Sequence, residues 1–510
     1  MIQNLNFLPI LLPMLAGVLL LMRPFGKSKS IRRVGSVVFS TITFLVSLAL
    51  LLKVQTSGTQ IYAIGDWSAP FGIVLVADPL STLLVCLTTL LGLVIILYAS
   101  AGDDEKGSFF HPLVHFLILG VNGAFLTGDA FNLFVFFEVL LIASYSLLMH
   151  GGDKRNTRAA LQYVIMNLVG SAVFLIALGV LYGVLGTLNM ADMAQQVSQL
   201  QGDDVHLAKI GGLLLLVVFA LKGALLPLHL WLPNTYATAL PVVAALFAIM
   251  TKVGVYSMMR VYTLIFGDEA GELSHMAQTW LWWLALATIA MGAVGVLASK
   301  DLRKLTANLV IVSVGTLVAL IAVQTIDASA AAVYYLVHST LVTAALFLLA
   351  DLIGRQRGEV ADRIIAGPPI LQPRLLGVCF LVAGVAVVGM PPLSGFIGKV
   401  WLLKATINAE YTFVFWPLYL LASLAILLAV AKAGSTVFWH HQESPIEGGS
   451  TERNESTRVH PVQLVALFIL ISAAPLMSIF AGPLSEYAIG AATQLHDFNS
   501  NINLILSGGQ

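Results

Sequence analysis

Long apolar segments recur along almost the whole chain and constrain its fold more than any other feature. Stretches of about 17–25 apolar residues can cross the hydrocarbon core of a bilayer as helices, which satisfy their own backbone polar groups. We count about 14 such segments between short polar breaks. The sequence therefore predicts an all-α polytopic membrane protein. The expected spans are 4–22, 33–53, 75–98, 111–127, 129–149, 159–186, 208–228, 240–262, 276–298, 304–323, 328–352, 375–407, 411–437 and 462–485.

Composition agrees with a chain built for lipid and excludes several classes of function. Of the 510 residues 58% are hydrophobic and only 10% are charged, whereas soluble domains carry about 25% charge. The net charge is +0 and no long cationic run occurs, which argues against a nucleic-acid partner. Cys86 and Cys379 lack any paired spacing, so a Cys-ligated iron–sulfur cluster or a Cys-rich zinc site is excluded and no cofactor is expected.

The distribution of Lys and Arg over the loops predicts the orientation. Cationic loops are retained on the cytoplasmic side, and they alternate with loops that hold few cations beyond Lys53 and Lys209. We therefore expect a multi-pass membrane protein with both termini outside. The acidic run 267–272 also falls outside. The cationic loops include 23–33, 106, 154–158, 300–304, 355–374 and 453–458.

Two of the apolar segments are interrupted by proline and glycine near their middles. The breaks lie in 221–233 and in Gly389-Met-Pro-Pro-Leu-Ser-Gly-Phe-Ile-Gly-Lys399, within expected spans seven and twelve. Broken helices in corresponding positions of two halves are typical of inverted-repeat transporters, although proline kinks used only for packing are the alternative. We expect N-terminal helices, two five-helix repeats, a cytoplasmic loop and a last helix with its tail, over 1–110, 111–262, 276–437, 438–461 and 462–510.

Few ionisable residues remain inside the spans, and each is a candidate for function. A lysine at the centre of a membrane helix costs about 2.5–3.5 kcal/mol. Glu138 lies mid-span and needs a cation, and we expect Lys222 to be its partner in a pair that an approaching ion or proton could switch. A purely structural ion pair is the alternative.

Further buried groups could extend this pair into a line. Burial disfavours the charged form of lysine, so Lys252 and Lys399 could exchange protons with Lys222 through water. His338 titrates near neutral pH and suits a relay between them. Snorkelling lysines and a satisfied core histidine are the alternatives. Lys432 is a possible outlet of the line or a snorkelling residue.

Other polar residues give weaker signals. His111 and His115 are spaced i, i+4, as two metal ligands on a helix would be, but no third ligand is evident. Asp78 begins the third span and is expected to cap its helix. A sodium ion prefers oxygen ligands, and the in-span carboxylates are scarce beyond Glu138 and Asp129. Both are candidates for a sodium ligand, although we place no sodium site.

Taken together, the residues identify the chain as similar to the antiporter-like membrane subunits shared by Mrp complexes and respiratory complex I. The likeness covers nearly the whole chain. Because it has lysine rather than glutamate at 399, and because of its length, the chain resembles the D subunit of the Mrp type. The motifs that carry it are Glu138, Lys222 with Pro227-Leu-His-Leu-Trp-Leu-Pro233, Thr251-Lys-Val-Gly-Val-Tyr256, Asp301-Leu-Arg-Lys-Leu305, His338-Ser339 and 389–399.

The resemblance implies a function and a location in the bacterial inner membrane, as well as a fold. It implies that Glu138, Lys222, Lys252, His338 and Lys399 form a central polar axis, which Arg303 can join. The expected activity is proton movement coupled to sodium efflux, by a transporter subunit without redox chemistry, among partners like the A, B, C, E, F and G subunits of Mrp. A proton-pumping subunit of complex I or of a membrane-bound hydrogenase, and a non-conducting scaffold, are the alternatives.

Overall fold

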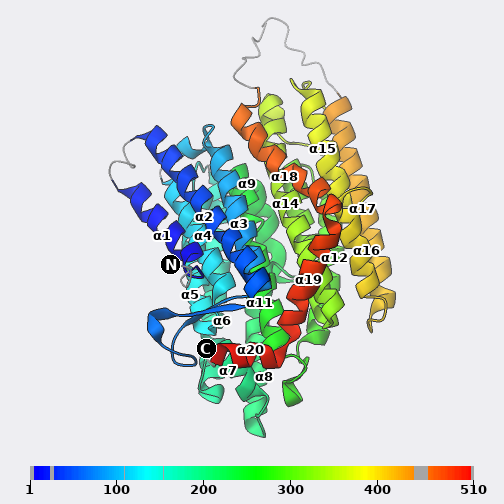
Figure 1. The fold of residues 1–510 in the computed structure, drawn as a ribbon. Coiled ribbons are helices and arrows are strands. Elements are labelled where there is room, and N and C mark those ends of the chain that lie inside the picture. Colours follow the sequence, from blue (N-terminus) through cyan, green and yellow to red (C-terminus); the bar gives the residue numbers. More distant parts are fainter. Residues whose placement is uncertain (1–4, 23–27, 108, 153, 441–457, 507–510) are drawn as a thin grey trace, which may run out of the picture.

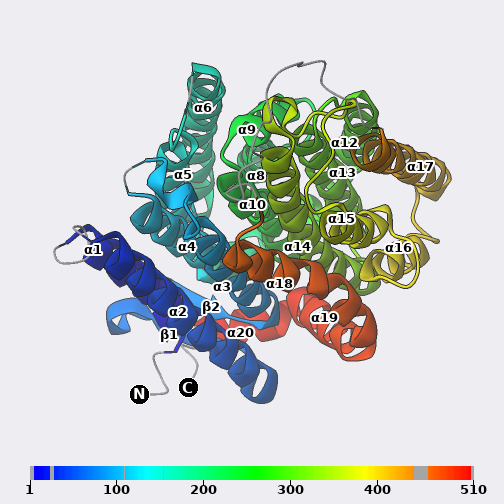
Figure 2. The same cartoon turned by 90° about the horizontal axis from the view of Figure 1, so that it is seen from above.

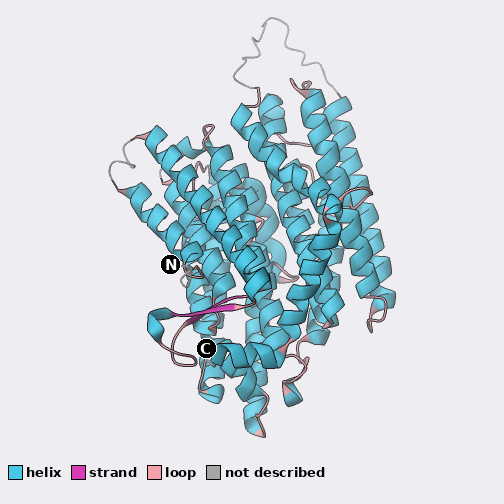
Figure 3. Ribbon diagram, in the orientation of Figure 1, coloured by secondary structure: helices cyan, strands magenta, loops and turns pink. Residues whose placement is uncertain are grey.

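The computed structural model describes residues 5–22, 28–107, 109–152, 154–440 and 458–506, and it is a bundle of long helices. The helices run side by side, with the connecting loops gathered at the two ends of the bundle (Figures 1 and 3). The prediction of an all-α polytopic protein is confirmed. Much of the predicted loop 438–461, together with Arg23 and Lys27, lies outside the described residues.

The helices fall into four consecutive groups along the chain. The N-terminal group is α1 (Leu8–Leu21), α2 (Lys29–Ser57) and α3 (Pro79–Ala99). The next is α4 (Phe110–Leu126), α5 (Ala130–Leu148), α6 (Lys154–Leu185), α7 (Met190–Val197), α8 (Asp203–Gly223), α9 (Trp231–Thr238), α10 (Pro241–Phe247) and α11 (Met250–Arg260). The third is α12 (Gln278–Ala298), α13 (Leu302–Val323), α14 (Ile326–Gln356), α15 (Pro373–Val388), α16 (Ser394–Ala405) and α17 (Thr412–Trp439). The last is α18 (Pro461–Ile479), α19 (Ala481–His496) and α20 (Phe498–Leu506).

Most of the expected membrane spans coincide with helices of suitable length. Within the described residues, 11 helical segments are long and apolar enough to cross a membrane. Three shorter apolar helices, α1, α4 and α15, fall on further expected spans. The total of about 14 crossings stays a prediction, because length and composition do not establish that each helix crosses.

The structure corrects the sequence-based boundaries in two places. A two-stranded antiparallel hairpin, β1 (Gln60–Ala63) and β2 (Val74–Ala77), precedes the third span, which starts only at Pro79 because Asp78 caps the helix. The last predicted span, 462–485, is wrong at its end. The α18 helix stops at Ile479, and α19 continues to His496 because Ala488, Ala492 and Leu495 bury one of its faces.

Both predicted helix breaks are present, and they share a local geometry. The α8 helix ends at Gly223, followed by Ala224 in the left-handed region, and α15 ends at Val388, followed by Gly389 in the same region. Three residues after this position, each break has a proline that follows a cis peptide bond. It is Pro227 in the first break and Pro392 in the second. The shorter helices α9 and α16 then continue the two spans. The division into repeats 111–262 and 276–437 stays a prediction.

Cationic loops gather at one end of the bundle, which we call the charged-loop end. Arg33 of α2 pairs with Asp104, and Arg355 of α14 pairs with Asp103 in the same short loop. At the opposite end, Asp129 bridges to Asn189. Seen from above, α1 lies at one edge of the bundle and α17 at the other (Figure 2). Loops with Lys and Arg are thus separated from the hairpin end.

Candidate functional site

Lys222 is held at the first helix break by a neutral partner. It lies at the C-terminal end of α8, where the helix dipole favours a cation, and only 5% of its surface is exposed. Its Nζ donates to Asn167 Oδ1 of α6 at 3.0 Å and lies 5.7 Å from the centre of the Phe137 ring. Gly170 lets α6 and α8 approach, because a Cβ there would lie 2.5 Å from Leu221.

Glu138 is linked to Lys222 indirectly. The Ser171 hydroxyl of α6 donates to Glu138 Oε1 and also lies 3.0 Å from the Asn167 carbonyl oxygen. No ion pair joins Glu138 to Lys222, and both belong to the described part of the chain. The prediction of a direct pair is therefore corrected. Asn167 and Ser171, one helical turn apart, occupy the space between the two charges.

Lys252 lies on the helix that touches the first break. It is 1% exposed in α11, and its Nζ donates to Ser313 Oγ of α13 at 2.8 Å. A Cβ on Gly254 would lie 2.6 Å from the Gly223 backbone nitrogen. The glycine pair therefore allows α8 and α11 to pack backbone to backbone, with Lys222 and Lys252 on touching helices.

His338 continues from Lys252 through aromatic and hydroxyl side chains. The Tyr335 hydroxyl lies beside Ser313, the partner of Lys252, and its ring centre is 5.9 Å from that of His338 on the same helix. His338 Nδ1 lies 2.8 Å from Ser394 Oγ, at the start of α16. The histidine thus contacts the second break, which fits a position between Lys252 and Lys399.

Lys399 is held by backbone that the second break sets free. Its Nζ donates to the Val388 carbonyl at 2.6 Å and to Ser423 Oγ of α17 at 2.7 Å. A carbonyl at a helix C-terminus has no intrahelical partner, so the end of α15 supplies an acceptor. Gly389 has φ +77°, and a Cβ there would lie 2.5 Å from Lys399 Cδ. Only glycine leaves room for the lysine stem.

Three other predicted residues lie away from this line. Lys432 is exposed on α17 and makes no hydrogen bond or ion pair within the described ranges. Arg303 is held by Asp362 at the bundle end, through its side chain at 3.1 Å and its backbone N–H at 3.0 Å. Asp129 caps α5 by accepting from the Asn132 N–H at 2.7 Å. It is nine residues from Glu138, or about 13 Å along a helix, so the two carboxylates cannot share one sodium ion.

The histidine pair on α4 has separate partners. His111 Nε2 lies 3.1 Å from Asp104 Oδ2, whereas His115 Nε2 lies 3.1 Å from Ser36 Oγ of α2. Within the ranges that the structure describes, no three His, Cys, Asp or Glu side chains group as metal ligands.

Sequence reasoning missed the neutral partners of the axis. They are small polar residues on neighbouring helices, and in sequence they look like ordinary Ser and Asn of a membrane helix. The i, i+4 spacing of Asn167 and Ser171 beside the glutamate helix is the only signal that could have marked them. The missed partners are Asn167, Ser171, Ser313, Ser394 and Ser423.

Sequence reasoning also missed a buried ion pair on α11, about two helical turns beyond Lys252. Lys252, Tyr256 and Arg260 are spaced i, i+4, i+8 and lie on one face of the helix. Arg260 Nη2 pairs with Asp78 Oδ2 at 2.5 Å and donates to the Tyr256 hydroxyl at 3.2 Å. Asp78 accepts from the Ser81 N–H at 2.8 Å, which confirms the predicted helix cap. A polar stripe thus runs from the axis toward the hairpin end.

The fold and the line of lysines inside the bundle are typical of an ion-translocating membrane subunit. Comparisons with known proteins agree with this class. The family profile described as "NADH:quinone oxidoreductase/Mrp antiporter, TM" matches residues 127–427. The chain belongs to this family.

Two curated relatives are D subunits of antiporters. The chain is 37% identical to the D subunit of a probable K(+)/H(+) antiporter of Rhizobium meliloti, over 97% of this chain and 96% of that protein. It is 39% identical to the D subunit of a Na(+)/H(+) antiporter of Bacillus subtilis, over 92% and 93% of the two chains. A chain of the Mrp complex from Dietzia sp. DQ12-45-1b shares the fold with a TM-score of 0.86 at 24% identity, over 98% and 99% of the two chains.

Proposed function

We propose that this chain is the proton-translocating subunit of a multisubunit antiporter that exchanges protons for a monovalent cation. The names of its relatives support antiport, with sodium for one and potassium for another. The observation that carries the proposal is the succession of Lys222 and Lys252, which are buried, and Lys399, which is half-buried, each hydrogen-bonded to a neutral group. A lysine without a fixed counter-ion can release its proton, which a lysine in an ion pair does not do readily.

The first break would act as the switch. A charged Glu138 stabilises the protonated form of Lys222 across Asn167 and Ser171. When a proton or a cation neutralises Glu138, the charged form of Lys222 loses this support and its proton moves toward Lys252. His338 and Lys399 then pass the proton onward at the second break.

The membrane potential can drive such an exchange. One elementary charge that crosses 100 mV is worth about 2.3 kcal/mol, so unequal numbers of protons and cations would be coupled to the potential. Sodium and potassium prefer oxygen ligands, and in the described parts of this chain no three His, Cys, Asp or Glu side chains group so as to hold a metal ion. We therefore propose that the cation crosses largely in another subunit.

The assembly and orientation extend the proposal. We place the charged-loop end of the bundle in the cytoplasm, because Lys and Arg are retained there, with both termini outside. The repeats would be 111–262 and 276–437, each with one helix break. The partners would be the other subunits of an Mrp-type complex, and the chain itself would carry out no redox chemistry.

A second candidate is a proton-pumping subunit of a redox enzyme. The family description includes NADH:quinone oxidoreductase, which favours it to that extent. Flavin or iron–sulfur subunits that purify with the chain would establish this alternative, and their absence from an active antiporter complex would remove it.

Cation-dependent dissipation of a pH gradient in inverted vesicles tests the proposal. Sodium and potassium are added in turn to the wild-type complex and to Glu138→Ala and Lys222→Ala versions at equal expression. We expect exchange to fall to background in both. The matched control is Lys432→Ala, which removes an exposed lysine. Unchanged exchange in the two axis variants would move the chemistry to another subunit.

A further inference from the structure

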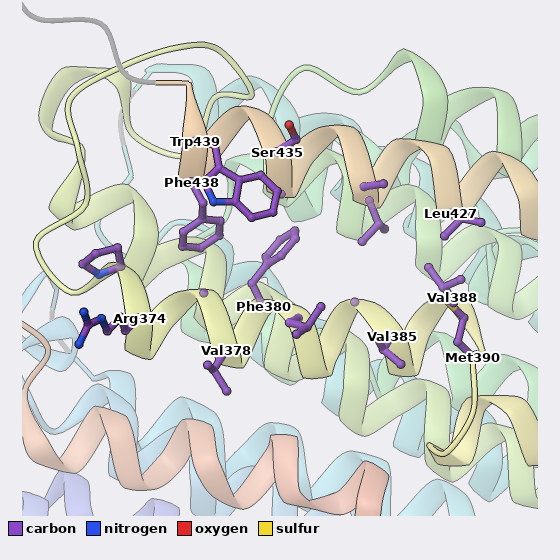
Figure 4. Close-up of a pocket in the computed structure, with 17 residues that line it drawn as sticks. Arg374, Val378, Phe380, Val385, Val388, Met390, Leu427, Ser435, Phe438 and Trp439 are labelled. Atoms are coloured by element: carbon purple, nitrogen blue, oxygen red, sulfur yellow. The ribbon is translucent and has the colours of Figure 1, made fainter.

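A deep apolar groove lies between α15 and α17, on the outer side of the second break. Its volume is about 710 Å³. Arg374 and Trp439 lie at one end of the groove, and Val388 and Met390 lie at the other (Figure 4). Both helices belong to the membrane-spanning part of the chain, so the groove opens toward lipid or toward another subunit.

The space exists because the groove is lined by glycine where a larger side chain would fill it. Gly377 of α15 and Gly434 of α17 both line the groove. A Cβ on Gly377 would meet nothing closer than Phe438 at 3.7 Å, which is an ordinary contact. The backbone at this position therefore tolerates a side chain, and the groove would lose volume if one were present.

The length of the groove indicates what occupies it. Fourteen residues of helix separate Arg374 from Val388, which is about 21 Å. Half of a bilayer with its headgroups is about 20–22 Å thick, whereas a partner helix that spans the hydrocarbon core is about 30 Å long. The groove thus matches one lipid leaflet and stops where α15 breaks.

The charge at its mouth indicates the headgroup. Arg374 is the charged side chain of the groove lining, it is exposed, and no carboxylate pairs with it anywhere in the described ranges. Arginine binds phosphate through paired hydrogen bonds, and basic sites between membrane helices bind anionic headgroups. Trp439 beside it is 78% exposed, as is typical of aromatic residues at the membrane interface.

We propose that this groove binds one anionic phospholipid, with the phosphate against Arg374 and an acyl chain that extends to Val388. The inner end of the chain would pack against the residue whose carbonyl accepts the hydrogen bond from Lys399. The bound lipid would thereby close the lipid-facing side of the second break. Binding follows from the groove alone, whereas any effect on exchange also rests on the proposed function.

Retained lipid is the first readout, and it requires no transport activity. The complex is purified from vesicles of equal parts phosphatidylglycerol and phosphatidylcholine, and bound phospholipid is counted by native mass spectrometry. We expect Gly377→Leu, which fills the groove, to retain one phosphatidylglycerol fewer per complex. We expect Arg374→Gln to lose the preference for phosphatidylglycerol, and Arg374→Lys to keep it.

Matched variants on α6 control for unspecific effects. Gly179 is a helix glycine with nothing within 4 Å of its added Cβ, and Arg158 is exposed near the start of the same helix. Gly179→Leu and Arg158→Gln should leave the retained lipid unchanged. Unchanged lipid in both groove variants, or an equal loss in the controls, would overturn the proposal.

A cross-linking experiment tests the competing occupant. A Gly377→Cys version that forms a cross-link to another subunit in the assembled complex would show that a protein segment fills the groove, and would overturn lipid binding. Exchange in phosphatidylcholine alone is the second readout. If the wild-type complex loses the bound lipid in phosphatidylcholine but still exchanges cations for protons, lipid binding in the groove stands. Only the effect of the lipid on the second break is then refuted.

Discussion

Three lysines at the centre of the bundle and three arginines toward its ends are held by different kinds of partner. Lys222, Lys252 and Lys399 donate to amide, hydroxyl and carbonyl oxygens. Arg260 and Arg303 are paired with carboxylates, and so is Arg33. A fixed counter-ion keeps a cation charged, whereas a neutral acceptor leaves its proton free to move. We propose that this difference separates groups that conduct protons from groups that anchor the fold.

The largest effect is expected from Lys252→Met, which tests the conducting side of this comparison. Exchange should fall to background, since no other buried lysine lies between Lys222 and His338. Folding stability should not fall, because an apolar side chain of similar volume replaces a desolvated amine. Exchange in inverted vesicles and thermal unfolding of the purified complex measure the two quantities. If Lys252→Met destabilised the complex as strongly as a substitution in an ion pair does, the distinction between conducting and anchoring groups would be lost.

The matched substitution two turns along the same helix, Arg260→Met, tests the anchoring side. It leaves the carboxylate of Asp78 buried without a partner, which costs about 3–5 kcal/mol of stability. Thermal unfolding and the yield of assembled complex are the measurements. Adding Asp78→Asn, which keeps an N-cap residue, should recover most of the loss. If the double variant folds normally but no longer exchanges, the pair belongs with the conducting groups.

Asp104→Asn probes the charged-loop network as a function of pH. Burial by itself would raise the pKa of the Asp104 carboxyl, but hydrogen bonds from Arg33 and His111 outweigh it and hold the pKa well below its usual range. A carboxyl with a lowered pKa stabilises the fold above its unfolded pKa of about 4, and this contribution is lost as the pH falls through the lowered value.

We therefore expect Asp104→Asn to cost about 1.5–3 kcal/mol at neutral pH, the range for a hydrogen bond to a charged group. The difference from wild type should persist down to about pH 4 and shrink below it. Unfolding of the purified complex between pH 7 and pH 3 measures this. A difference that grows on acidification would contradict the assignment.

Ser171→Ala should have a smaller effect, on transport alone. It removes the hydroxyl between Glu138 and Asn167, and a net hydrogen bond of about 1–1.5 kcal/mol corresponds to roughly tenfold in rate. Initial exchange rates check the expectation, with Ser171→Thr as the control that keeps the hydroxyl. Equal rates in both variants would show that the glutamate acts without this link.

The smallest effect is expected from Lys432→Gln. This lysine is exposed and makes no hydrogen bond or ion pair in the part of the chain that the structure describes, so stability should change by less than about 0.5 kcal/mol and exchange should be unchanged. Loss of exchange would restore Lys432 as the outlet of the axis, the role that its sequence position suggested.

Much of the architecture could be predicted, because lipid imposes strong rules on sequence. A helix that crosses a bilayer must be long and apolar, so the expected spans fall on observed helices. The breaks at 224–227 and 389–393 could be read from proline and glycine. The hairpin and the helices beyond Ile479 could not. The strands are only four residues long, β2 is as apolar as the span that follows it, and an alanine-rich amphipathic helix carries a weak pattern.

The site divides in the same way. The sequence by itself marked the charges of the axis, because a lysine or glutamate in an apolar span is costly and stands out, but it did not mark the buried pair of Arg260 and Asp78. Only the tertiary structure decided their partners. Lys222 meets an asparagine 55 residues away and Lys252 meets a serine 61 residues away, and Arg260 meets Asp78 across 182 residues. Such contacts depend on how helices pack, which a residue's own neighbours in sequence do not encode.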